Sequence, residues 1–135
     1  MLVIRDSQMQ VLRASLEERE IADLLAELRL GFPSHFQSLD SAAASAEITE
    51  RVAVARNHGL TWRSSVGHFV FLCYRVSPDF YRLPFVQSRM RDERLPPDLR
   101  FRRFLRRLTP ERVNRMVRAC ARMRRTAASH REQQS

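Results

Sequence analysis

The chain has 135 residues, of which 44% are hydrophobic, and a formal net charge of +9 at pH 7, which fits a globular protein with one core. Its longest apolar run, at residues 69–74, is far shorter than the roughly 20 residues that span a bilayer, and residues 1–6 do not resemble an export signal. We therefore predict a cytoplasmic protein with no membrane span, folded as a single helical domain over residues 1–126 with a flexible polar tail at 127–135.

The positive charge is carried by arginine alone and is distributed unevenly. All 24 basic residues are Arg, and eleven of them lie within residues 100–125. Residues 1–50 contain nine acids and four Arg, whereas residues 51–135 contain six acids and twenty Arg. This polarity favours encounter with an acidic partner, which could be a protein, a nucleic acid or an anionic membrane. The Arg total also fits the codon bias of a GC-rich genome, although codon bias alone would not cluster the arginines.

Only three Gly and six Pro interrupt long stretches with helical periodicity. The predicted fold is therefore all-α, a bundle of about five to six helices with an apolar central helix. The first helix is expected to begin near residue 6 and to end at Gly31, just before Pro33. A second helix over residues 42–58 should end at Gly59, which suits a left-handed C-cap.

Residues 64–76 are apolar on nearly all sides. This pattern predicts a central helix that its neighbours cover, with a buried strand as the alternative. A short helix over residues 84–91 and a Pro-rich turn at 95–98 are expected to follow.

The C-terminal third predicts two Arg-rich amphipathic helices. In residues 99–108 the apolar side chains recur at helical spacing, and Arg fills most other positions. The last helix should start with Thr109 as N-cap and Pro110 at the first helical position, and run to about residue 126. Its outer face carries arginines three and four residues apart, at Arg115, Arg118, Arg122 and Arg125.

Residue types that carry catalysis or bind metals do not gather in the sequence. The four histidines, at 35, 58, 68 and 130, lie in different segments and form no metal-binding helical pair. Cys73 and Cys120 lie in segments expected to be buried, so we predict free core thiols rather than a disulfide or a metal site. No catalytic residues, metal or cofactor are predicted, and the protein is expected not to be an enzyme.

Nucleic-acid binding is the rival function, because Arg on helices both neutralises phosphates and recognises guanine edges. Against it, the only stretch that resembles a helix-turn-helix would use the apolar residues 64–76 as recognition helix, and such a helix should expose polar side chains. A basic helix on an anionic membrane is less favoured, since the last helix lacks the Trp and Phe residues that anchor such helices.

Several turn and core patterns resemble a family of small bacterial proteins encoded beside type VI secretion spike (PAAR or VgrG) and toxin genes. The patterns lie at residues 32–35 (Phe-Pro-Ser-His), 58–72, 77–80 (Ser-Pro-Asp-Phe), 83–86 (Leu-Pro-Phe-Val) and 94–97 (Arg-Leu-Pro-Pro). The resemblance covers about residues 1–125. It departs from the family at residue 77, where Ser replaces the usual Gly, and at residue 85 or 86, where Phe85 or Val86 replaces the usual Trp.

This resemblance implies an accessory of a secreted effector, acting as an adaptor, a chaperone or an immunity protein. We predict an adaptor or chaperone whose partner is a toxin or a spike protein, with immunity to a cytosolic toxin and nucleic-acid binding as the alternatives. Trp62 is either a lid on the core or an interface anchor. The predicted partner-binding residues are Arg100, Arg103, Arg107, Arg115, Arg118, Arg122, Arg125 and Trp62.

Overall fold

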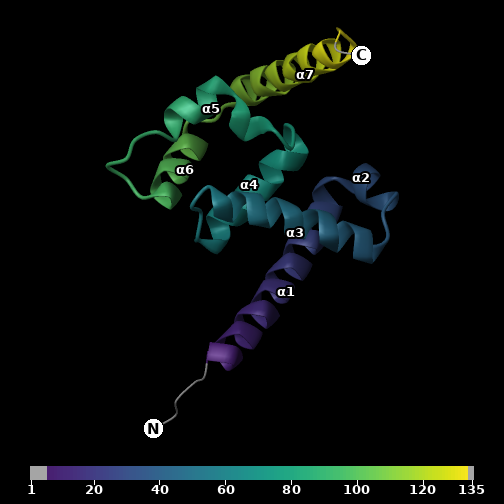
Figure 1. Cartoon of the computed structure of the whole chain (residues 1–135), viewed down its shortest axis with the longest axis vertical. Coiled ribbons are helices and arrows are strands. Elements are labelled where there is room, and N and C mark those ends of the chain that lie inside the picture. Colours follow the sequence, from purple (N-terminus) through teal and green to yellow (C-terminus); the bar gives the residue numbers. More distant parts are fainter. Residues whose placement is uncertain (1–5, 134–135) are drawn as a thin grey trace. The chain divides into compact units, whose positions relative to one another are not determined.

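The computed structural model describes the backbone of residues 6–133 and the side chains of residues 17–129. Over this part the chain forms helices and no strand, which confirms the all-α prediction (Figure 1). The helices are α1 (Asp6–Gly31), α2 (Pro33–Gln37), α3 (Ser41–Asn57), α4 (Arg63–Arg75), the 3-10 helix η1 (Phe80–Arg82), α5 (Pro84–Arg89), α6 (Pro97–Arg106) and α7 (Pro110–Gln133). These seven α-helices exceed the five to six expected, since Pro33 starts a separate short helix directly after α1.

The residues group into two compact units, Met1–Val52 and Ala53–Ser135. The first contains α1, α2 and most of α3, and the second contains the end of α3 and all later helices. The single domain expected over residues 1–126 stays a prediction. Each unit is described below by itself.

In the first unit, the expected end of the first helix at Gly31 and the expected second helix are confirmed within one residue. Leu25, Leu28, Phe36 and Ile48 are buried and form the apolar centre of the unit. The start of α3 is capped by Asp40, whose Oδ1 accepts a hydrogen bond from the Ala43 amide at 2.7 Å. Polar contacts on the outside of the unit include His35 Nε2 with Glu47 Oε1 at 2.8 Å.

The second unit is built on a cluster of aromatic rings. Phe69 of α4 lies 4.9 Å from Phe80 and 6.0 Å from Phe101 of α6, measured between ring centroids. Tyr81 and His58 lie 5.8 Å from the same ring. Because these rings come from α4, η1, α6 and the residue after α3, the cluster joins these four parts of the unit.

Helix α4 is buried on one face only, and its opposite face is exposed. The segment predicted at residues 64–76 does form a helix, Arg63–Arg75, as favoured over the strand, and one face is buried at Val66, Phe69, Val70 and Cys73. The opposite face is exposed, and its Phe71 side chain retains 45% of its accessible surface. The exposed positions are Ser64, His68, Phe71 and Arg75, at helical spacing. The expected covered central helix is therefore not confirmed.

The turn that enters α4 is fastened to the start of α6. Asp98 of α6 is 4% exposed, and its carboxylate accepts hydrogen bonds from Thr61 Oγ1 at 2.7 Å and from the Trp62 amide at 2.9 Å. The Thr61 amide donates to the same carboxylate at 3.0 Å. Burial by itself raises the pKa of Asp98, but these hydrogen bonds outweigh it and hold the pKa below its usual range.

Gly59 makes this turn possible, as its predicted left-handed conformation is confirmed by a φ of +88°. A Cβ atom at this position would lie 2.9 Å from Cγ of Pro97, whose ring is rigid. We expect Gly59→Ala to lower the free energy of unfolding by about 2 kcal/mol, since the strained backbone and the close contact add. Urea unfolding measures this change.

Gly31→Ala is the matched control for Gly59→Ala. A Cβ at Gly31 meets no atom within 4 Å, and the residue closes α1 without a positive φ. This substitution should leave the free energy of unfolding unchanged or raise it by up to about 1 kcal/mol, because Ala is the better helix former. Equal effects at both positions would contradict the proposed strain at Gly59.

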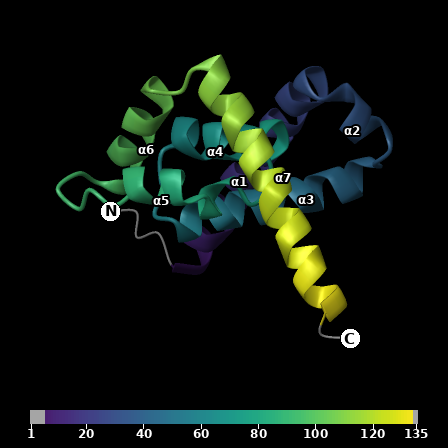
Figure 2. The same cartoon turned by 90° about the horizontal axis from the view of Figure 1, so that it is seen from above.

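Helices α5 and α6 lie side by side in both views, and α7 continues from the turn after α6 (Figure 1, Figure 2). Thr109 caps α7 as predicted, with its Oγ1 accepting a hydrogen bond from the Arg112 amide at 3.2 Å. The helix runs to Gln133 instead of ending near residue 126, because no Gly or Pro follows to stop it. Backbone residues 127–133 are thus helical rather than an irregular tail.

Cys73 and Cys120 are free and buried, which confirms the expected core thiols. Burial raises the pKa of the Cys120 thiol. Both cysteines therefore act as small apolar residues in the second unit.

Candidate functional site

The surface of α7 that faces the start of α5 forms a groove of about 710 Å³, here called the α7 groove. Its floor is apolar and includes Leu83, Pro84, Phe85 and Met116. Phe85 keeps 37% of its surface accessible, so the floor is open to a partner. Its rim is basic and is formed by Arg112, Arg115, Arg118 and Arg122.

The rim arginines differ in how far the fold already uses them. Arg112 donates from Nη1 to the Arg107 carbonyl at 2.6 Å, and so it closes the turn between α6 and α7. Among the residues with described side chains, no carboxylate pairs with Arg115, Arg118 or Arg122. Three guanidinium groups beside an apolar floor can bind carboxylates bidentately while apolar side chains of the partner enter the groove.

A second groove, here called the Phe71 groove, lies between the exposed face of α4 and helices α6 and α7 and encloses about 640 Å³. Phe71 and Leu105 contribute to its apolar floor, and Arg75, Arg102 and Arg106 lie around them. Sequence reasoning missed this groove because Phe71 was assigned to a buried helix. The signal was present, since Ser64, His68 and Arg75 mark a polar face at helical spacing from Phe71.

The structure separates the predicted partner-binding arginines. Arg115, Arg118 and Arg122 share the α7 groove, and Arg125 is exposed further along α7 without lining either groove. The other three line a smaller pocket, described below: Arg100 and Arg103 belong to α6, and Arg107 directly follows the helix.

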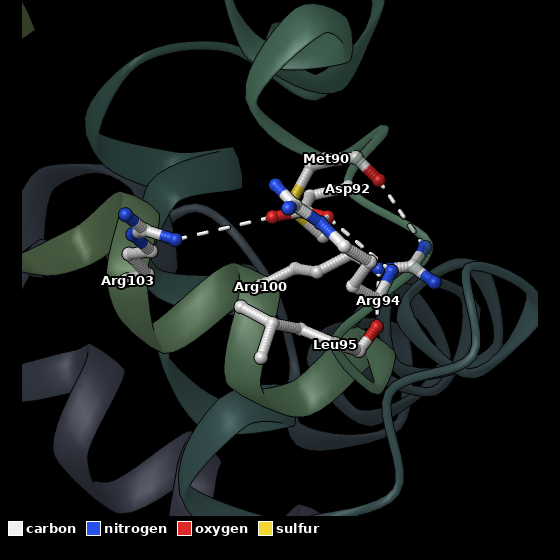
Figure 3. A network of polar contacts seen from close by, with 6 residues as sticks. All are labelled: Met90, Asp92, Arg94, Leu95, Arg100 and Arg103. Atoms are coloured by element: carbon white, nitrogen blue, oxygen red, sulfur yellow. Dashed lines mark hydrogen bonds and ion pairs between the residues drawn. The ribbon is translucent and has the colours of Figure 1, made fainter.

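Arg100 has a structural role that its position in the sequence did not reveal. Its Nε donates to the Leu95 carbonyl at 2.6 Å and its Nη1 to the Met90 carbonyl at 3.2 Å (Figure 3). These bonds hold the loop before α6 against the helix. Arg100 is therefore a residue that shapes the surface rather than a freely exposed partner contact.

Trp62 lies immediately before α4, where its amide donates to Asp98. Its side chain retains 41% of its accessible surface, so the ring is only partly covered. It lines neither the α7 groove nor the Phe71 groove. A shared surface of Trp62 with the arginines of α7 is therefore not supported, and the choice between lid and anchor stays open.

Among the described residues, no group of three or more His, Cys, Asp or Glu is placed to hold a metal ion. No helix in the same part of the chain is long and apolar enough to cross a membrane.

Comparison with protein-family models, with curated proteins and with solved structures finds no match to this chain.

Proposed function

We propose that the chain is a non-enzymatic binding protein that grips an acidic protein surface through the α7 groove. The observation that carries this proposal is the set of three arginines, Arg115, Arg118 and Arg122, without carboxylate partners among the described residues, beside an open apolar floor. Interfaces commonly combine an apolar centre with a charged rim, and Arg is enriched in them. Charge complementarity also accelerates encounter.

The spacing of the arginines along the rim sets the spacing of the carboxylates that a partner must present. Arg115 and Arg122 are seven residues apart on one helix, a separation of about 10 Å along its axis. A fitting partner presents carboxylates over that distance, with one or two apolar side chains between them to contact Phe85. An acidic amphipathic helix meets this requirement.

The biological setting comes from the sequence resemblance. It points to an adaptor or chaperone of a type VI secretion effector or spike protein that acts in the cytoplasm. An immunity role would use the same groove and differs only in that binding inhibits a toxin. Nucleic acid is the competing occupant, because the same arginines would also bind phosphates.

The decisive experiment is capture of the partner from native cell lysate treated with nuclease, followed by measurement of the affinity for that partner. We expect Arg115→Glu combined with Arg122→Glu to weaken binding at least about 100-fold. Each lost charge-assisted contact is worth about 1.5–3 kcal/mol, and 1.4 kcal/mol corresponds to a factor of ten.

The matched control is Arg82→Glu combined with Arg91→Glu, which changes the net charge equally in the same unit. Both side chains are exposed and line neither groove. This variant should bind within about threefold of the natural protein, since exposed charges away from the contact act weakly. Equal loss in both variants, or capture that disappears with nuclease, would refute a specific protein-binding groove.

A further inference from the structure

We propose that a pocket beside α6 binds a phosphate group, either as free inorganic phosphate or as a phosphate monoester. The pocket, here called the α6 pocket, encloses about 240 Å³. Five arginines line it together with a single acid, Asp92, and no other charged residue does so. They are Arg89, Arg94, Arg100, Arg103 and Arg107.

The pocket arises from two segments that meet in the fold. Arg100 and Arg103 of α6 and Arg107, the residue that caps the C-terminus of the helix, are spaced by three and four residues and line the pocket with Phe104. Arg89 and Arg94 come from the end of α5 and the loop after it. Each segment supplies only part of the positive charge, and the packing of α5 on α6 brings the two parts together.

Two features keep the guanidinium groups in place. The hydrogen bonds of Arg100 go to the carbonyls of Leu95 and Met90, which carry no charge, so its position is fixed without being neutralised. The guanidinium carbon of Arg89 lies 5.6 Å from the centre of the Phe85 ring, which also positions a charge without cancelling it. Arranged in this way, guanidinium groups match the oxygens of phosphate better than solvated side chains do.

Asp92 is the one carboxylate that lines the pocket, and it contacts two of the arginines. Its Oδ1 accepts a hydrogen bond from Arg94 Nε at 3.0 Å, and its Oδ2 lies 3.9 Å from Arg103 Nη1 (Figure 3). The hydrogen bond from Arg94 lowers the pKa of Asp92. One carboxylate against five arginines leaves four positive charges around the pocket. Arg107 has no carboxylate partner among the described side chains.

A phosphate group carries between one and two negative charges at neutral pH, so it offsets more of this surplus than a single carboxylate or a halide does. Its oxygens can accept hydrogen bonds from several of the guanidinium groups that line the pocket. Asp92 competes for Arg94 and Arg103, so the acid weakens rather than supports binding. This site is separate from the α7 groove and goes beyond the proposed function.

The test is calorimetric titration of the whole chain with inorganic phosphate, with ionic strength held constant by chloride. We expect saturable binding of one phosphate per chain. Arg103→Gln combined with Arg107→Gln should weaken it at least tenfold, whereas Asp92→Asn should tighten it at least threefold. The matched control, Arg102→Gln combined with Arg106→Gln, removes the same charge from neighbouring positions outside the pocket and should change affinity less than twofold.

A second titration, with glycerol 3-phosphate, distinguishes a phosphate monoester from free inorganic phosphate as the ligand. Tighter binding of the monoester identifies a phosphorylated molecule, and tighter binding of inorganic phosphate identifies the free ion. Absence of saturable binding, equal loss in the two double variants, or weaker binding by Asp92→Asn would overturn the proposal. Circular dichroism checks that each variant keeps its helical content, and a variant that loses it is replaced by the single substitution Arg107→Gln.

Discussion

Asp98→Ala is expected to lower the free energy of unfolding by about 3 kcal/mol, because it leaves polar groups unpaired where α4 begins. The carboxylate accepts from the amides of Thr61 and Trp62 and from the Thr61 hydroxyl. It also lies in the first turn of α6, so one negative charge is placed at the positive ends of two helices. Urea unfolding followed by circular dichroism gives the change.

The same carboxylate should make stability depend on pH, and the sign follows from its lowered pKa. In the unfolded chain an Asp titrates near 3.9, and in the folded chain Asp98 titrates below that value. Its contribution is therefore complete above about pH 5 and is lost as the pH falls through the folded pKa. Asp98→Asn should unfold more easily at pH 7 and lose less stability than the natural protein between pH 5 and pH 2.

Glu93→Gln is the control for both measurements. It also replaces a carboxylate by an amide in the second unit, but its side chain is exposed. Its free energy of unfolding should stay within about 0.5 kcal/mol of the natural value. If Asp98→Ala lowered the free energy of unfolding as little as this control does, the hydrogen bonds between Asp98 and the turn before α4 would not contribute to stability.

The elements that the sequence predicted well are those that local chemistry determines. Gly31 followed by Pro33 ends one helix, Gly59 takes its left-handed conformation, and Thr109 with Pro110 starts another helix. Each of these signals depends on residues a few positions apart. The predicted end of the last helix, near residue 126, was wrong by several residues. Helix α7 runs to Gln133, because no Gly or Pro interrupts it after residue 126.

Features that depend on distant partners were missed. Asp98 was assigned to a Pro-rich turn, and its hydrogen-bond partners lie 36 and 37 residues away in sequence. Arg100 was predicted as a partner contact, although the carbonyls it binds become available only when the preceding loop folds back. The clustering of Arg was visible in the sequence, but its division among two grooves and a pocket depends on how α5, α6 and α7 pack.

Phe69 and Phe71 show why the buried face of α4 could not be identified from the sequence. Both residues are Phe and they are two positions apart, yet only Phe69 is buried. Phe69 is 3% exposed and contacts four rings, so Phe69→Ala should lower the free energy of unfolding by about 3–5 kcal/mol. That loss is a large part of the usual stability of a domain. Urea unfolding at pH 7 measures it.

Phe71→Ala is the matched variant on the opposite face of the same helix, and it should lower the free energy of unfolding by less than about 1 kcal/mol. With 45% of its surface exposed, Phe71 leaves little cavity when it is truncated. If its groove takes part in partner binding, the variant should instead lose affinity, as an exposed aromatic anchor does. Similar unfolding energies for the two variants would show that α4 is covered on both faces, and the Phe71 groove would then be no binding surface.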